Sequence, residues 1–297
     1  MSGRTVHLVD GHVYIFRAHF AMPEMRAPDG TPTSAAYGFT NMLIRHWREQ
    51  RPTHLAVCFD HAMTSFRNDL EPEYKAQRGE PDEELEAQFG LCKESAAAIG
   101  LSVFEAKDFE ADDVIATLAK QLLAKRDTRV VVHTTDKDLA QLVREDGRLV
   151  LADIGKPGVT DADAVREKFG VDPAQIPDYL GLVGDAVDNL PGVPGVGAKT
   201  AAAVLQAFGR IEDIPVDPER WADLPIRGAK RAAGRIAEHR DRALRTRQLA
   251  TVRYDVPGIR ANLRDLALKR PHPTQAEPLF NRLGWNRILD RLSQLGQ

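Results

Sequence analysis

The chain has 297 residues, of which 43% are hydrophobic and 28% are charged. This composition is typical of a globular protein with a substantial core, arranged as one large domain or two modest ones. The sequence has no apolar run of the ~18 residues that a membrane-spanning helix needs, and it begins with a strand pattern rather than a signal peptide. Its two cysteines exclude a disulfide framework or a cysteine-based metal site, and they fit a reducing cytoplasm.

Short apolar runs predict buried strands over residues 6–10, 54–60, 129–135 and 148–151. Helical periodicity follows over residues 34–50, 82–99, 112–125 and 137–143. Strands that alternate with helices predict an α/β fold with a mostly parallel central sheet flanked by helices. In such sheets, ligands bind outside the carboxyl ends of the strands, where Asp10, Asp60 and Asp136 fall.

Acidic side chains recur in five short clusters, each near a predicted strand end or helix start. The nine carboxylates are Asp10, Asp60, Glu110, Asp112, Asp113, Asp136, Asp138, Asp185 and Asp188. Two carboxylates ~5 Å apart at an effective dielectric of ~20 repel by roughly 3 kcal/mol. If the clusters converge, positive charge must lie among them, and a pair of divalent cations with a preference for oxygen ligands is the simplest source. Such a site indicates phosphodiester chemistry.

The net charge of −3 comes from 40 basic and 43 acidic residues. Without the nine clustered acids, 40 basic residues face 34 acidic ones, which leaves a charge of +6. Once cations neutralise the clusters, the rest of the molecule is therefore basic enough to bind a polyanion, although the arithmetic does not require one.

Each cluster has a simpler interpretation. Glu110, Asp112 and Asp113 flank a helix start, where acids are stabilised by the helix dipole, and Asp136 has the position of an N-cap. The apolar stripe that follows Asp113 favours ligands over caps there, whereas the Asp136–Asp138 pair alone is ambiguous. His12 stands where a phosphatase with a nucleophilic aspartate would carry a second Asp. The histidines show no ligand spacing, which predicts core or surface positions.

Three other segments are distinctive. Residues 61–79 form a polar, irregular excursion directly after a predicted strand of the site, and such long loops are usually functional. The glycine-rich stretch from Gly192 to Thr200 opens a helix that extends to about Phe208, and its backbone N–H groups suit a phosphate. A helix over residues 227–247 is dense in arginine and lysine, and a last helix covers 285–295.

Together, these motifs resemble the 5′ nuclease (flap endonuclease) family, and most closely the 5′–3′ exonuclease domain of bacterial DNA polymerase I. The resemblance rests on segments 8–11, 52–60, 109–116, 134–142 and 184–201, which follow one another in the order typical of the family. His12, Thr135 and the Ala186-Val187 pair depart from the usual pattern, but no carboxylate is lost.

The resemblance implies a nuclease core of the PIN-like 5′ nuclease type over residues 1–170, with a helical arch at about 62–90. It implies a helical DNA-binding subdomain over 171–297, with a helix–hairpin–helix motif at about 178–208. One metal would be bound by Asp10, Asp60, Glu110 and Asp112. A second metal would be bound by Asp136, Asp138, Asp185 and Asp188, with Asp113 nearby. Two Mg²⁺ ions per site are implied, Mn²⁺ is expected to substitute, and a K⁺ ion is implied at the hairpin.

The same resemblance assigns roles to cations and aromatic residues. Lys75 and Arg78 match arch residues that contact the scissile phosphate, Arg17 is similar to a phosphate-steering arginine, and Tyr74 matches an arch aromatic. The DNA-binding residues expected from the arch, the hairpin and the basic helix are Phe66, Arg67, Gly192, Gly195, Gly197, Lys199, Thr200, Arg227, Lys230 and Arg231.

The implied activity is hydrolysis of phosphodiester bonds at 5′ flaps, nicks and 5′ ends of duplex DNA, including RNA primer ends, in primer removal and DNA repair. We expect a stand-alone, monomeric, bacterial cytoplasmic enzyme associated with the nucleoid, with a DNA polymerase as a candidate partner. Two alternatives remain: a non-catalytic protein that binds DNA junctions, which the complete set of acids disfavours, and a metal-dependent ribonuclease of the PIN class, which would lack the hairpin.

Overall fold

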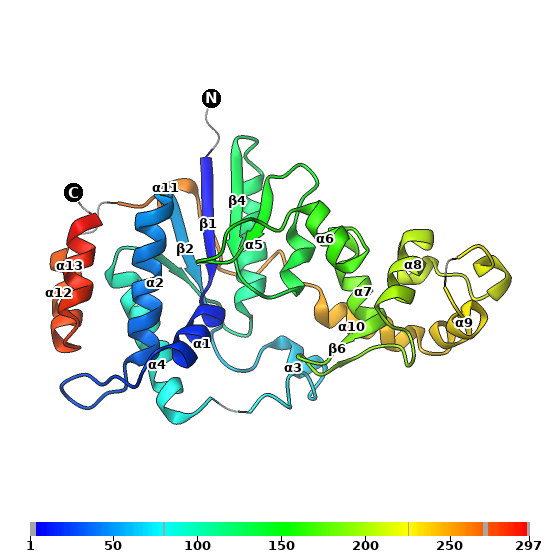
Figure 1. The fold of residues 1–297 in the computed structure, drawn as a ribbon, viewed down its shortest axis with the longest axis horizontal. Coiled ribbons are helices and arrows are strands. Elements are labelled where there is room, and N and C mark those ends of the chain that lie inside the picture. The colour runs from blue at the N-terminus through cyan, green and yellow to red at the C-terminus, as the bar shows by residue number, and fades with distance from the viewer. Residues whose placement is uncertain (1–3, 80, 225, 270–272, 296–297) are drawn as a thin grey trace.

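A five-stranded sheet forms the centre of the structure, a computed structural model that describes residues 4–79, 81–224, 226–269 and 273–295. Its strands are β1 (Arg4–Asp10), β2 (His54–Cys58), β3 (Ser102–Phe104), β4 (Thr128–His133) and β5 (Leu149–Ala152). They lie in the order β3-β2-β1-β4-β5 and every neighbouring pair is parallel. The predicted α/β fold class is confirmed, with helices on both faces of the sheet (Figure 1).

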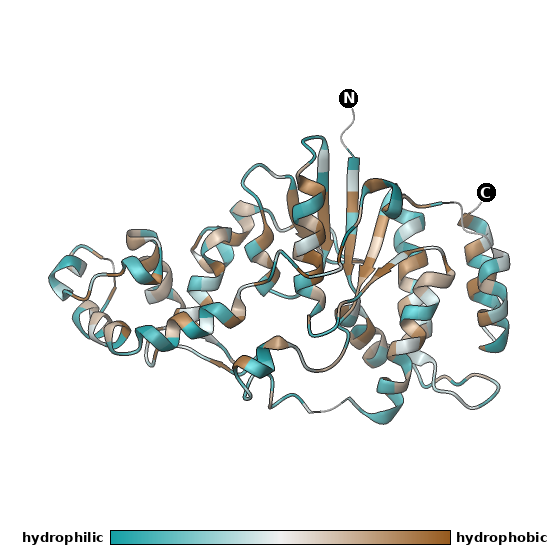
Figure 2. Ribbon diagram, turned by 180° about the vertical axis from the view of Figure 1, so that it is seen from behind, coloured by the Kyte–Doolittle hydropathy of each residue, from teal (hydrophilic) through white to brown (hydrophobic). Residues whose placement is uncertain are grey.

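Alternate residues of the central strand β1 enter different cores. Val6 and Leu8 pack against α5 (Ala111–Leu123), whereas Val9 packs with α1 (Gly11–Ala21), α2 (Ser34–Gln50) and α4 (Glu83–Ala98). The strands are apolar along most of their length in Figure 2, as expected for a parallel sheet that is covered on both faces. Each fully buried aliphatic side chain contributes ~1.5–3 kcal/mol, so both helical layers are fixed to the sheet.

The predicted strands end close to the observed ones where the strand ends carry the acidic residues. β1, β2 and β4 end within two residues of the predicted positions, and the helix predicted over 34–50 is α2. The segment 137–143 forms a short 3-10 helix, η1 (Asp138–Leu142), rather than an α-helix. The edge strand β3 was not predicted, because three residues carry too little pattern.

The second half of the chain is helical. It contains α6 (Ala162–Phe169), α7 (Ile176–Val183), α8 (Ala198–Phe208), α9 (Ala229–Glu238) and α10 (Arg240–Ala250), with 3-10 turns η2 (Pro173–Gln175), η3 (Ile211–Asp213) and η4 (Pro218–Trp221). The predicted basic helix over 227–247 is two helices, because the backbone leaves the helical conformation at His239. Among the described residues, none of the helices is long and apolar enough to span a bilayer.

The last helices return to the sheet. Leu268 N donates to Thr53 O at 2.9 Å after α11 (Leu263–Leu266). Helices α12 (Pro273–Arg282) and α13 (Asn286–Leu295) bury Phe280 and Trp285 in the core that contains Phe39 of α2. They lie at the opposite end of the molecule from α8 and α9 (Figure 1). The predicted helical DNA-binding subdomain over 171–297 stays a prediction, and its last two helices cover α2 and α4.

A tight hairpin joins α7 to α8. Its strands β6 (Gly184–Asp185) and β7 (Leu190–Pro191) pair antiparallel and hold the acidic segment between them. Gly184 has a φ of +83°, and a Cβ on Gly192 would lie 2.3 Å from the carbonyl carbon of Val183. Only a residue without a side chain permits this approach.

We predict that Gly192→Ala lowers the free energy of unfolding by about 1–3 kcal/mol, because the new methyl group must push two backbone segments apart. Chemical denaturation with circular dichroism measures this. Gly90→Ala is the matched control, since Gly90 lies in helix α4 with open space around it and alanine is the better helix former. Equal stability of Gly192→Ala and the native chain would contradict the packing argument.

Candidate active site

Five acidic side chains from four separate segments meet beside one cavity of about 720 Å³ at the carboxyl edge of the sheet. Asp10 ends β1, Asp60 follows β2, and Asp136 follows β4. Glu110 precedes α5, and Asp112 lies in its first turn. All five line the cavity. The parallel topology therefore brings the predicted residues of the first metal site to one place, with Asp136 from the predicted second set.

Neighbouring groups hold these carboxylates in fixed orientations. Thr134 Oγ1 donates to Asp10 Oδ2 at 2.8 Å, and the backbone N–H of Ala111 donates to Asp60 Oδ1 at 2.6 Å. Burial, followed by the nearby charge of Asp60, raises the pKa of Asp10 to about 7. Burial and then Asp136 raise the pKa of Asp112 well above its usual value. Burial first, and the neighbouring carboxylates second, therefore disfavour the charged form of both acids.

A second acidic cluster lies next to the first. One carboxylate oxygen each from Asp138, Asp185 and Asp188 lies within 4.8 Å of the other two. All three residues are buried. Asp138 Oδ1 accepts no hydrogen bond from the described residues. Burial and then Asp136 raise the pKa of Asp138 to about 7. A buried carboxylate oxygen that accepts no hydrogen bond is costly, and a bound cation would satisfy it.

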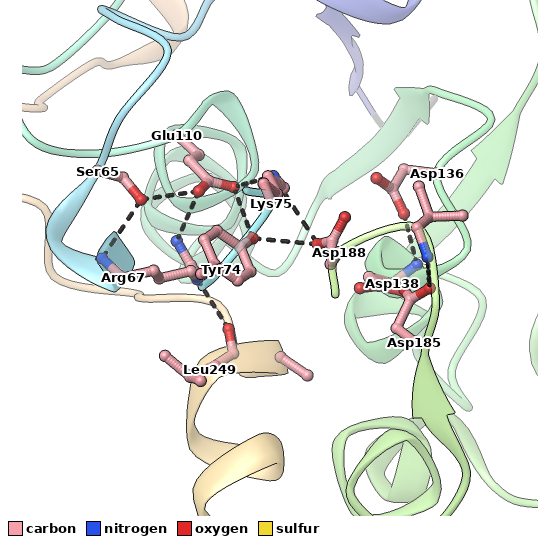
Figure 3. Close-up of polar contacts among 12 residues, drawn as sticks. Ser65, Arg67, Tyr74, Lys75, Glu110, Asp136, Asp138, Asp185, Asp188 and Leu249 are labelled. Carbon is pink, nitrogen blue, oxygen red and sulfur yellow. Dashed lines mark hydrogen bonds and ion pairs between the residues drawn. The ribbon is translucent and has the colours of Figure 1, made fainter. Parts of the chain in front are cut away.

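Basic side chains pair with these acids, and Lys75 lies between Glu110 and Asp188 (Figure 3). Lys75 Nζ is 2.8 Å from Glu110 Oε2 and 3.8 Å from Asp188 Oδ2, so it joins the two clusters. Arg78 Nη2 is 2.5 Å from Asp188 Oδ1. Lys137 pairs with Asp185, and its Nζ is 3.4 Å from Asp138 Oδ1. Lysine and arginine side chains of the protein therefore supply part of the positive charge that the clustered acids need.

Glu110 differs from the other acids because cations surround it. Its burial alone would raise its pKa, but Lys75 and Arg67 outweigh that and lower the pKa to about 2. Ser65 Oγ also donates to Glu110 Oε1 at 2.7 Å. Tyr74 is buried, and its hydroxyl lies 3.3 Å from Glu110 Oε2 and 3.1 Å from Asp188 Oδ2. Burial raises the pKa of Tyr74, so its hydroxyl remains a donor at neutral pH.

The segment that carries Lys75 is anchored to the hairpin between α7 and α8. Lys75 N donates to Asp188 O at 3.0 Å, and Asn189 Nδ2 donates to Glu73 O at 2.7 Å. Lys75 and Asn189 both adopt the left-handed backbone conformation, with φ of 56° and 55°. For a lysine this conformation is unfavourable, and it is retained because the surrounding contacts determine it. Such strain is common at functional sites.

Two of the predicted site residues are buried and pair with each other, and their predicted roles stay predictions. Arg67, expected to contact DNA, is 2% exposed, and Asp113, expected near the second metal, is fully buried. Their side chains form two hydrogen bonds of 2.7 and 2.8 Å with each other. Arg67 Nε also donates to Leu249 O at 2.7 Å. The pair therefore ties the short helix α3 (Phe66–Leu70) to α5 and to the end of α10.

Other expected residues lie at the margin. Arg17 Nη1 donates to Asp153 Oδ1 at 2.6 Å and to Ile154 O at 3.2 Å, and Arg17 is not among the residues that line the cavity. The ring of Phe66 packs against Phe109, with ring centroids 5.5 Å apart. Phosphate steering by Arg17 and DNA contact by Phe66 stay predictions.

The predicted duplex-binding residues lie on the helical half. Those exposed are Gly195, Gly197, Lys199, Arg227, Lys230 and Arg231, while Gly192 and Thr200 are partly buried. Gly195 faces Arg235 of α9, since a Cβ there would lie 1.6 Å from Arg235 Nη1. The glycine hairpin and the basic helix are therefore adjacent, as a shared contact with a polyanion requires.

Sequence reasoning missed several residues that support the site. His12 Nδ1 accepts from the backbone N–H of Asp60 at 3.1 Å and lines the cavity. Thr134 and Lys137 bond to Asp10 and Asp185. Lys137 stands between two predicted ligands, Asp136 and Asp138, and this position in the sequence could have indicated that it lies at the site. For His12 the sequence indicates departures from the family pattern and from that of a phosphatase, but no role at the site.

The donor set is suited to hard cations. Every predicted ligand near the two clusters offers carboxylate oxygens, which Mg²⁺ and Mn²⁺ prefer. Oxygens bound to one octahedral Mg²⁺ at 2.0–2.1 Å lie about 3–4 Å apart. The oxygens of the second cluster lie within 4.8 Å of one another, and Asp138 Oδ1 accepts no hydrogen bond from the described residues. The residues present therefore fit a divalent metal site.

Comparison with family models gives two matches that adjoin. A model described as the 5′–3′ exonuclease, N-terminal resolvase-like domain, matches residues 5–170. A second, the 5′–3′ exonuclease, C-terminal SAM fold, matches residues 171–274.

Individual proteins agree with these matches. DNA polymerase I of Bacillus caldotenax is 38% identical over 290 residues, which are 96% of this chain but 32% of that protein. The chain thus spans about a third of that curated relative. A 5′–3′ exonuclease of Aquifex aeolicus is 38% identical over 218 residues, 73% of this chain and 74% of the relative. A bacteriophage T5 D15 flap endonuclease complex with DNA and metal ions has the same fold, with a TM-score of 0.63 at 21% identity and 99% coverage of both chains.

We predict that Mg²⁺ binding depends on pH through a group with a pKa of about 7. Asp10 and Asp138 have raised pKa values, so both are largely protonated at pH 6, and Mg²⁺ must displace protons there. The affinity should therefore be about tenfold weaker at pH 6 than at pH 8 for each proton displaced. Melting temperatures measured against Mg²⁺ concentration at both pH values give the two affinities.

In Asp138→Asn the dependence on pH should become shallower, because one displaced proton is removed. Asp290→Asn, a change at an exposed position of α13, should behave like the native chain. A native Mg²⁺ affinity that is the same at pH 6 and pH 8 would show that the carboxylates are not protonated in the metal-free protein.

We predict that Arg67→Ala destabilises the fold by about 3–5 kcal/mol, because it leaves Asp113 buried and unpaired. Denaturant unfolding measures the loss. Arg245→Ala is the control, since Arg245 makes an exposed pair with Glu71 and should cost less than about 1 kcal/mol. Similar losses for both variants would mean that the Arg67 pair is not a structural anchor.

Proposed function

The chain belongs to the 5′–3′ exonuclease family, and we propose that it is a structure-specific, metal-dependent 5′ nuclease that cleaves 5′ flaps and 5′ ends of duplex DNA. The observation that carries the proposal is the convergence of the two acidic clusters at the carboxyl edge of the sheet. They lie beside a cavity that also contains Lys75 and Arg78. An open site of this kind suits phosphodiester hydrolysis.

We assign the metals to two groups of carboxylates. Asp10, Asp60, Glu110 and Asp112 would hold one divalent cation, and Asp136, Asp138, Asp185 and Asp188 the other. Asp113 is left out because Arg67 engages it. Two bound cations would supply Lewis-acid activation of water and stabilisation of the leaving oxygen. Mg²⁺ is the proposed ion, Mn²⁺ its substitute, and K⁺ a proposed ligand of the Gly192–Thr200 hairpin.

The side chains of the arch contribute charge and orientation. Lys75 pairs with Glu110, and Arg78 pairs with Asp188. When these two acids bind metal cations, their pairing with Lys75 and Arg78 would weaken. A scissile phosphate would then bind the two basic side chains. Both could then stabilise negative charge that develops on the phosphoryl oxygens. Tyr74 would keep Glu110 and Asp188 in place through its hydroxyl. Arg17 would steer phosphate only after release from Asp153.

Duplex DNA would lie across the helical half. Lys199, Arg227, Lys230 and Arg231 are exposed there, and the Gly192–Thr200 hairpin presents backbone near Arg235. Such groups contact phosphates and carry no base readout, so selectivity is for structure rather than sequence. Phe66 would contact the strand near the arch. The proposed functional units are residues 1–170 with the arch at 62–90, and the helical part after 171 with its motif at 178–208.

The biological setting follows from this activity. Removal of 5′ flaps and RNA primer ends is required in replication and repair, so we propose a bacterial cytoplasmic, nucleoid-associated monomer that acts beside a DNA polymerase.

A DNA-junction-binding protein without activity would not need both acidic clusters. A ribonuclease of the PIN class would not need the hairpin and the basic helices.

The test is cleavage of a 5′-labelled flap DNA with Mg²⁺, in parallel with blunt duplex and single-stranded RNA. We predict that the flap is cleaved fastest, and that Asp185→Asn and Lys75→Ala each lower the rate constant by about 10²–10³ while duplex binding is retained. Single-turnover kinetics and fluorescence anisotropy measure the two quantities.

Asp290→Asn serves as the control for the loss of one negative charge at a distance from the site. Binding without cleavage by the native chain would support the junction-binding alternative, and preferred cleavage of single-stranded RNA would support the ribonuclease. Native cleavage rates in Asp185→Asn would sink the metal assignment.

A further inference from the structure

Three histidines meet between the sheet and helix α2, away from the carboxylate clusters. His7 lies on β1, His133 on β4 and His46 on α2. His7 Nδ1 is 2.9 Å from His133 Nε2 and 3.2 Å from His46 Nε2. The three ring nitrogens all lie within 4.8 Å of one another. His46 and His133 are each 4% exposed, while His7 is partly buried and gives the group a side open to solvent.

The strands place these rings on a common face. Residues on one face of a strand alternate, so His7 shares the face of Val9, which packs against α2 rather than α5. Val9 is paired in register with His133, which places His133 diagonally beside His7 on that face. The core of this face contains Phe39, Leu43 and Ile44 of α2, the helix that carries His46. The cluster is therefore built by three separate elements.

We propose that His7, His46 and His133 form a second metal site, which binds a transition metal ion of the Zn²⁺ class. Zn²⁺ binds imidazole nitrogen at about 2.0–2.1 Å in tetrahedral geometry, which separates two ligand nitrogens by about 3.3 Å. The separations of 2.9 and 3.2 Å at His7 Nδ1 are near this value. Three nitrogen ligands also distinguish this site from the carboxylate clusters, which suit hard cations.

Hydrogen bonding alone satisfies the trio poorly. Two Nε2 atoms face the single Nδ1 of His7. If His7 Nδ1 carries a proton, that one proton is shared between two acceptors. If it does not, its one lone pair can accept from only one of the two partners. A metal ion, in contrast, accepts a lone pair from each ring at full strength.

The protonation state of the rings is ready for a metal. Burial and the nearby Arg129 lower the pKa of His7 to about 4. Burial and then His7 lower the pKa of His46 to about 4, and burial lowers the pKa of His133 well below its usual value. All three imidazoles are therefore neutral at pH 7, and no proton needs to be displaced when the metal binds. Solvent would supply the fourth ligand on the side of His7.

A metal here would stabilise the frame that presents the catalytic acids. His7 precedes Asp10 by three residues on β1, and His133 precedes Asp136 by three residues after β4. A bound ion would join both strands to α2 through coordinate bonds, at a distance from the cleavage site. The role is structural, and it does not depend on the proposed nuclease activity.

The test uses the full chain with Zn²⁺ or Co²⁺ as the probe, in millimolar Mg²⁺, which competes with the probe for the carboxylate clusters. We expect one Zn²⁺ per chain by calorimetry, and a rise in melting temperature of about 5 °C or more at a hundredfold excess over Kd. His46→Gln and His133→Asn should each weaken Zn²⁺ at least tenfold. His239→Gln, at the junction of α9 and α10, is the matched control and should bind like the native chain.

Spectroscopy of the native protein keeps the proposal testable even if a variant fails to fold. X-ray absorption of the Zn²⁺-loaded protein should show three imidazole ligands, and Co²⁺ should give the strong visible absorption of a tetrahedral site. Asp185→Asn should leave both signatures unchanged. Oxygen-only coordination, no Zn²⁺ bound in the presence of Mg²⁺, or native affinity in both histidine variants would each overturn the site.

Discussion

Mutual repulsion of carboxylates at one edge of the sheet is the constraint around which the molecule is arranged. Two such groups ~5 Å apart repel by roughly 3 kcal/mol, and each acid of the site has several neighbours of the same sign. Burial, followed by repulsion from Asp60 and Asp136 respectively, raises the pKa values of Asp10 and Asp138. The fold tolerates the clusters because packing of the sheet fixes the strand ends, whatever charge they carry.

The chain supplies part of the compensation through residues that are also proposed to bind the scissile phosphate. Lys75 and Arg78 pair with Glu110 and Asp188, and these pairs hold the segment after α3 against the hairpin of α7 and α8. The lowered pKa of Glu110 shows that this acid is the best compensated of the set. A divalent cation would weaken the hold of the acids on Lys75 and Arg78 and free both for a phosphate. Charge compensation and substrate binding therefore draw on the same two side chains.

Local sequence patterns predicted the sheet and the position of the acids, because an apolar run that ends in Asp10 carries its own signal. They failed where the interaction joins distant segments. Arg67 and Asp113 each match a functional motif. The two residues lie 46 positions apart in the sequence, and in the structure they form a buried pair. The sequence of the final helices does not indicate which surface they cover. Only the structure shows that they pack against α2.

The histidines show the same limit most clearly. His7 lies 39 positions from His46 and 126 from His133, so no spacing rule for metal ligands connects them. Alternation along the strand separates the two chemistries: His7 points toward α2, while Asp10, three residues later, belongs to the opposite set of positions and ends the strand at the cavity. With the proposed histidine site on one face and carboxylate oxygens at one edge, the sheet would offer different donor atoms to a Zn²⁺-class ion and to a hard cation. An ion bound by the three histidines would then join the strands at a distance from the carboxylate clusters.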